Sequence, residues 1–329
     1  MMFNVKKIKN ITTDGNEVKE IMDMKMKKFI AAAAIVSMMA AALTGCGSGD
    51  SDAANAEDGS KTAASEWDSA NDITVVSRED GSGTRGAFIE LFGVEEEVDG
   101  EKVDMTTEGA QITNSTSVML TTVAGDEYAI GYVSLGSLDD TVKAVKIDGA
   151  EATAENIKSG TYKVSRPFNI ATKADLDNEV AADFINFIMS EEGQKVIADN
   201  GYIPVDDVKA FKGTQPSGKA VVGGSSSVSP VMEKLAEAYK EVNPNAEIEL
   251  QTSDSTTGMT SAIDGSYDIG MASRELKDEE LAKGLTATVI ATDGIAVIIN
   301  KTNPAEDMAA DQVKAIYTGE ALSWDEVVE

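Results

Sequence analysis

Three short segments rich in serine, threonine and glycine carry the residue types of this chain that are best suited to chemistry. They are residues 77–85 (SREDGSGTR), 224–230 (GSSSVSP) and 252–258 (TSDSTTG). Each follows an apolar, strand-like run and precedes a run with helical spacing. One such loop is more often an ordinary helix cap. Three of them in one cleft would offer hydroxyls and free helix N–H groups, which suit a small tetrahedral oxyanion.

The first of these loops adds a fixed positive charge. Arg78 lies at its start, and a guanidinium keeps its charge at any physiological pH. Gly83 lets the backbone approach a ligand closely, while Ser82 and Thr84 supply hydroxyl donors. This loop therefore predicts one wall of an anion site.

The elements that position these loops alternate between strands and helices. Because ligands bind at the carboxyl ends of strands in open α/β sheets, the alternation predicts an α/β fold with the three loops at one edge. The predicted strands are 73–76, 128–133, 142–147, 166–171, 220–223, 248–250, 268–274 and 295–299. The predicted helices are 87–92, 117–123, 180–198, 231–242 and 259–263.

Composition excludes several classes of function. The net charge is −29, which argues against nucleic acid as a partner. With no histidine, no Gly-x-Ser-x-Gly elbow and no Ser-x-x-Lys, a surface hydrolase is disfavoured, and we expect no enzymatic activity. Residues 213–219 imitate a P-loop, but Ala220 stands where a metal-binding hydroxyl is needed. We expect neither a metal site nor a cofactor.

The N-terminal segment has the pattern of a targeting signal. Lysines precede an apolar run at residues 29–43, which is short for a membrane-spanning helix. It ends in Leu-Thr-Gly-Cys at 43–46, which resembles the lipobox of bacterial lipoproteins, and Cys46 is the only cysteine. We predict a signal peptide over 1–45, lipidation of Cys46 and a flexible tether over 46–66. The folded part would then be anchored by lipid on the extracytoplasmic face of the cell membrane.

Longer motifs resemble the phosphate-binding proteins of bacterial ABC transporters, the PstS family. They are residues 77–84, 224–230, 268–274 (DIGMASR) and 311–319 (DQVKAIYTG), the last followed by Trp324-Asp325. The resemblance covers about 67–329 and implies a two-lobed type II periplasmic-binding-protein fold with the ligand between the lobes. It implies a monomer that binds inorganic phosphate and passes it to the permease of an ABC importer. The residues that it matches to the phosphate shell are Arg78, Ser82, Gly83, Thr84, Ser226, Ser227 and Ser255.

The order of these motifs differs from the usual order in the family. There the 224-type loop comes first, so this chain resembles a circular permutant, with residues 211–220 joining the usual termini. Permutation makes one lobe continuous, over 169–291. The other lobe would be assembled from 67–168 and 292–329. We therefore expect the segment after Asp293 to share a sheet with strand 73–76, although it lies more than two hundred residues away.

A second departure concerns the discrimination between phosphate and sulfate. Many family members have an aspartate that accepts the proton of hydrogen phosphate where Ser273 stands here. Asp293, with Asp254 behind it, is our candidate for that role, and Ser273 stays in the predicted site. The alternatives left open are another oxyanion, such as sulfate or molybdate, and a non-transport role in phosphate sensing or adhesion.

Overall fold

The computed structural model describes residues 67–328, so the predicted signal peptide, Cys46 and the tether lie outside the described residues. The described part is a mixed α/β fold built on a ten-stranded sheet. Along its main path the strands are β11 (Ala246–Ser253), β10 (Gly218–Ser225), β12 (Ile269–Ala272), β8 (Ser165–Lys173), β13 (Leu285–Ile299), β5 (Ala129–Ser134), β1 (Thr74–Arg78) and β4 (Gln111–Thr113). Two short strands, β6 (Lys143–Ala144) and β9 (Ile203–Pro204), pair with β13.

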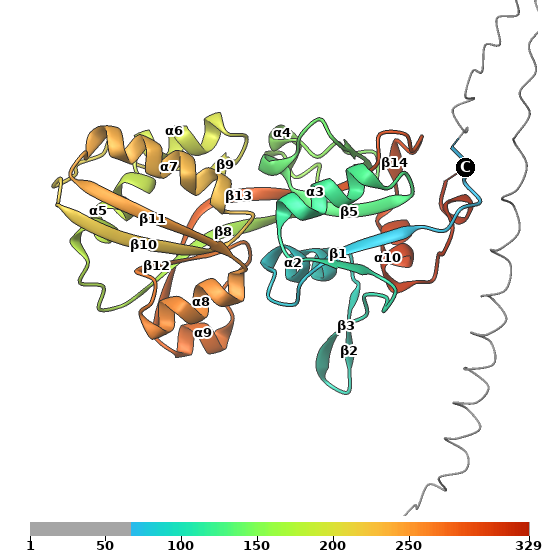
Figure 1. Ribbon diagram of the computed structural model, residues 1–329, viewed down its shortest axis with the longest axis horizontal. Helices are drawn as coiled ribbons and strands as arrows, with labels where there is room; N and C mark the ends of the chain where they lie inside the picture. Colours follow the sequence, from blue (N-terminus) through green and yellow to red (C-terminus); the bar gives the residue numbers. More distant parts are fainter. Residues whose placement is uncertain (1–66, 329) are drawn as a thin grey trace, which may run out of the picture. The chain divides into compact units, whose positions relative to one another are not determined.

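Helices and two small two-stranded sheets complete the fold (Figure 1). The helices are α2 (Gly83–Leu91), α3 (Thr116–Gly125), α4 (Ala154–Lys158), α5 (Glu179–Ile188), α6 (Glu191–Asp199), α7 (Ser229–Val242), α8 (Ser255–Asp264), α9 (Asp278–Ala282) and α10 (Ala310–Thr318), with 3-10 turns η1 (Leu135–Ser137) and η2 (Trp324–Glu326). The small sheets pair β2 (Glu95–Val98) with β3 (Glu101–Asp104), and β7 (Lys146–Ile147) with β14 (Asp307–Met308). Among residues 67–328, no helix is long and apolar enough to cross a membrane.

The buried apolar side chains separate into two groups, which we call the first and the second half. In the first half they come from residues 75–164 and 295–327, with Trp324 fully buried among them. In the second half they come from residues 168–291. The chain passes between the halves through the long strands β8 and β13, which lie side by side (Figure 1). A site between the halves is therefore held by the carboxyl ends of strands from both.

The long-range pairings expected from the permuted order are present. Residues 295–299 of β13 run antiparallel to β5, which is parallel to β1. Ala220 and Val222 of β10 are buried in the core of the second half together with Val180 of α5. The strand pairing and the shared core are both confirmed. The permuted order itself and the lobe boundaries, 67–168 plus 292–329 and 169–291, remain predictions.

Strand β13 is longer than the sequence predicted. The sequence pattern indicated only residues 295–299, but the strand begins at Leu285 and pairs with β8 along most of its first part. Residues 286–289 of this strand are exposed or half-buried, and a bulge separates Val289 from Ala291. Pairing across the sheet, rather than local apolarity, extends the strand.

The single helix predicted over 180–198 is wrong, because two helices occupy this segment. Helix α5 ends at Ile188, and Ser190 caps α6 by accepting a hydrogen bond from the Gly193 N–H. The apolar spacing continues across the break, which is why it suggested one helix. The Ser190 cap and the close approach at Gly193 set the boundary.

Gly193 gives a first test of this packing. A Cβ at Gly193 would lie 2.1 Å from the Phe187 carbonyl oxygen and 2.6 Å from that of Ile188. These are backbone atoms that cannot turn aside, so we expect Gly193→Ala to lower the free energy of unfolding by ~1–3 kcal/mol. Gly125→Ala is the matched control, because Gly125 is also helical and has nothing within 4 Å of its Cβ position. Denaturant unfolding that ranked the two variants equally would contradict this account.

Candidate functional site

In the first half, Arg78 and the start of helix α2 lie on the side that contacts the second half. Arg78 ends β1 and is 2% exposed. Its Nε and Nη2 donate to the two carboxylate oxygens of Glu79, each at 2.8 Å, which fixes the plane of the guanidinium. Ser82 caps α2 by accepting from the Arg85 N–H, so Gly83 and Thr84 form the first turn with free N–H groups.

The second half contributes serines from three strand ends. Ser226 and Ser227 follow β10 and precede α7, Ser255 opens α8, and Ser273 follows β12. The Ser225 Oγ donates to the Ser273 Oγ at 3.0 Å, and the Ser273 N–H donates to the Ser255 Oγ at 3.1 Å. Strands β11, β10 and β12 are parallel, which brings these ends together.

The two halves meet through these side chains. The Arg78 Nη2 donates to the Ser226 Oγ at 3.1 Å, and the hydroxyls of Thr84 and Ser227 lie 2.8 Å apart. A Cβ at Gly83 would lie 2.5 Å from the Ser255 Oγ. Eight of the nine residues predicted for the site therefore lie together across the two halves: Arg78, Ser82, Gly83, Thr84, Ser226, Ser227, Ser255 and Ser273.

Thr116 also belongs to this group, and the sequence reasoning missed it. It opens α3, and its Oγ1 lies 3.3 Å from the Ser226 Oγ and 3.2 Å from the Ser227 Oγ. Residues 115–117 are Ser-Thr-Ser between strand β4 and α3, the same signal as in the other three loops. The strand is only three residues long, which hid the pattern. We call Arg78, Thr84, Thr116, Ser225, Ser226, Ser227, Ser255 and Ser273 the polar cluster.

The polar cluster has the chemistry of an oxyanion site. Helices α2, α3, α7 and α8 all begin at it, so their N-terminal N–H groups and dipoles favour negative charge there. Its hydroxyls can rotate to donate hydrogen bonds. The Arg78 guanidinium adds a positive charge and can bind an anion through two hydrogen bonds. In residues 67–328 no group of three or more His, Cys, Asp or Glu residues could hold a metal ion.

Asp293 is the predicted site residue that lies apart from this group. Its Oδ1 accepts from the Ser134 Oγ at 2.9 Å, and its Oδ2 accepts from Arg166 Nη2 at 3.2 Å. Burial raises the pKa of Asp293 to about 6, although the neighbouring Arg166 charge acts in the opposite direction. Asp254, the second candidate, is half-buried and caps α8 through the Thr257 N–H.

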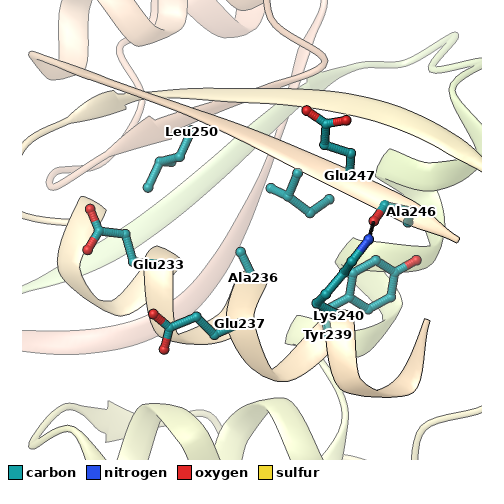
Figure 2. A pocket seen from close by; sticks show the side chains of 9 residues that line it. Glu233, Ala236, Glu237, Tyr239, Lys240, Ala246, Glu247 and Leu250 are labelled. Carbon is teal, nitrogen blue, oxygen red and sulfur yellow. Dashed lines mark hydrogen bonds between the residues drawn. The ribbon is translucent and has the colours of Figure 1, made fainter. Parts of the chain in front are cut away.

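Two hollows were compared with the polar cluster as candidate ligand sites. One of about 400 Å³ is lined by Thr116 and Ser226 of the polar cluster together with Glu233. The other, of about 380 Å³, lies between α7 and the edge strand β11 (Figure 2). Its lining includes Glu233, Glu237 and Glu247, and the Lys240 ammonium donates to the Ala246 carbonyl. Its acidic lining disfavours an anion, so we place the candidate site at the polar cluster.

Comparison with known proteins identifies the family of this chain. Residues 7–192 and 210–328 match the model of the PBP superfamily domain. The chain is 60% identical over 256 residues to "Phosphate-binding protein PstS 2" of Streptococcus agalactiae, covering 78% of this chain and 87% of the relative. It is 41% identical over 305 residues to the protein of the same name in Streptococcus pneumoniae, covering 92% and 100%. This chain belongs to the PstS family.

The fold of this PstS-family chain is also similar to a solved structure. That structure is the crystal structure of the phosphate-binding protein of a phosphate ABC transporter from Streptococcus pneumoniae TIGR4. The TM-score is 0.62 at 43% identity, covering 78% of this chain and all of that one. The pneumococcal relative aligns over its whole length, so it carries its segments in the same order as this chain.

Proposed function

We propose that this PstS-family protein captures inorganic phosphate outside the cytoplasm and delivers it to the membrane permease of an ABC importer. The observation that carries the proposal is the polar cluster, where a buried arginine and hydroxyls from both halves meet at four helix N-termini. The names of the streptococcal relatives support the same ligand. The role is binding and transport rather than chemical conversion.

In the proposed phosphate shell each residue has a separate role. Arg78 supplies charge, the first turn of α2 at Gly83 and Thr84 supplies N–H groups, and Ser226 and Ser255 supply hydroxyls from the second half. Ser82 orders the first turn as its cap, and Ser227 and Ser273 complete the hydroxyl wall. Asp293, the acceptor for the phosphate proton that the sequence suggested, lies apart from this shell and is bonded to Ser134 and Arg166. A monomer anchored through lipid on Cys46 would complete the proposal.

A second oxyanion is a specific alternative because of Ser273. A serine hydroxyl at this position can accept a hydrogen bond from hydrogen phosphate or donate one to sulfate. A site that relies on it alone discriminates weakly between the two ions.

Titration calorimetry of the chain with phosphate, sulfate and molybdate tests the proposal. We expect saturable binding of one phosphate per chain, tighter than that of the other two ions. Tighter binding of sulfate or molybdate would reassign the ligand while leaving the site in place. If none of the three ions bound, the proposal would be refuted.

A further inference from the structure

A second buried arginine, Arg166, lies outside the polar cluster and is paired with Asp293. Arg166 and Asp293 face each other on the neighbouring strands β8 and β13, and their side chains are 2% and 1% exposed. In the sheet these two strands lie between β12, which leads to Ser273, and β5, whose other neighbour β1 ends at Arg78. The pair therefore lies between the strand ends that carry the two walls of the proposed site.

The pairing leaves part of the Arg166 guanidinium unused. Its Nε and Nη2 both donate to the Asp293 Oδ2, at 3.4 and 3.2 Å. Its Nη1 is buried without a hydrogen-bond partner among residues 67–328, as is the hydroxyl of Tyr202. A buried donor without a partner is costly, so such groups are normally satisfied by water or a ligand.

The positive charges of Arg166 and Arg78 also act on each other. Burial lowers the pKa of Arg166, Asp293 raises it, and the positive charge of Arg78 lowers it. The two guanidinium groups thus lie close enough to repel each other. Arg78 is neutralised by Glu79, and Arg166 by Asp293. An anion in the polar cluster would experience both positive charges, and each is reduced by its carboxylate.

We propose that the Arg166–Asp293 pair is a second electrostatic determinant of the oxyanion site: Arg166 attracts the bound anion, and the charge of Asp293 limits that attraction. The inference rests on the proposed function and deepens it. It gives Asp293 a role that needs no contact with the ligand. Because charges in a protein interior interact without direct contact, the pair sets the affinity for dianions.

Three variants test the proposal through the sign of their effects on phosphate binding at about pH 8, where phosphate is mostly dianionic. Asp293→Asn removes the opposing charge, so we expect roughly tenfold tighter binding; Arg166→Gln should weaken it roughly tenfold. The double variant should bind about as the parent does. Ser134→Ala is the matched control, because it removes a hydrogen bond to Asp293 but no charge.

These outcomes separate the possible roles of the pair. A merely structural pair predicts weaker phosphate binding in both single variants. If Asp293 accepts the phosphate proton instead, Asp293→Asn should weaken phosphate binding and tighten sulfate binding. Either pattern would overturn the proposal. Phosphate binding by the parent, measured in the same titrations, tests the proposed function separately.

Removing one partner of a buried pair can prevent folding, so the parent protein supplies an independent readout. Sulfate keeps the same charge between about pH 5 and pH 8, so a change in its affinity reports on the protein. The charged and titratable groups around the Arg166–Asp293 pair are Tyr202 and, on the Arg166 side, Arg78. Burial raises the pKa of Tyr202, so it stays neutral. As Asp293 takes up its proton near pH 6, sulfate affinity should rise severalfold. A sulfate affinity that does not rise on acidification, including no measurable binding, would also overturn the proposal.

Discussion

Replacing Arg78 by alanine is expected to weaken phosphate binding by about 30-fold to nearly a thousandfold. The guanidinium is buried, lies at the junction of the two halves and donates to Ser226. Its loss would leave the anion with neutral donors and would also leave Glu79 without its partner. Losing a charge-assisted, bidentate partner in such a place costs ~2–4 kcal/mol.

Calorimetry of Arg78→Ala, Arg78→Lys and the parent with phosphate measures this effect. Arg78→Lys should recover only part of the affinity, because an ammonium lacks the planar fork that holds Glu79 and a ligand together. Lys234→Ala on the exposed face of α7 is the control for loss of one positive charge, and we expect it to bind as the parent does. Equal phosphate affinity in Arg78→Ala and the parent would show that Arg78 does not bind the ligand.

Adding one methyl group at Gly83 should weaken phosphate binding by about 5- to 150-fold while leaving the stability of each half nearly unchanged. The Cβ would lie 2.5 Å from the Ser255 Oγ and 2.8 Å from the Ser273 Oγ, both on the second half. Overpacking of this kind costs ~1–3 kcal/mol, and here the cost falls on the contact between the halves. The expected loss is therefore in affinity rather than in folding.

Gly86→Ala is a matched control in the same helix. Nothing lies within 4 Å of the Cβ position of Gly86, so this variant adds helix propensity without a clash. We expect Gly86→Ala to bind phosphate as the parent does and to be slightly more stable to urea. If both glycine variants lost affinity equally, the effect would come from α2 itself and not from closure against Ser255.

Much of the site could be predicted because local signals coincide there. At Arg78, Ser226 and Ser255 a strand end, a small polar loop and a helix start follow one another directly, and each signal can be recognised over a few residues. Thr116 escaped prediction because its strand, β4, is only three residues long and gives no periodic pattern. The parallel pairing of β4 with β1, which brings Thr116 to the cluster, is a long-range fact.

Other features depend on contacts between distant segments. The first part of β13 is a strand because it pairs with β8, more than a hundred residues earlier. The ionic partner of Asp293 is Arg166 for the same reason, and no spacing in the sequence shows that pairing. The break between α5 and α6 follows from the Gly193 backbone contact, which is likewise invisible in an apolar pattern.

A crystal structure of the chain grown with phosphate tests the central claim most directly. The account predicts a tetrahedral ion between the halves, within hydrogen-bond distance of the Arg78 guanidinium, the N–H groups of Gly83 and Thr84, and the hydroxyls of Ser226 and Ser255. Phosphate bound elsewhere, for example in the groove between α7 and β11 in Figure 2, with the polar cluster empty, would contradict it.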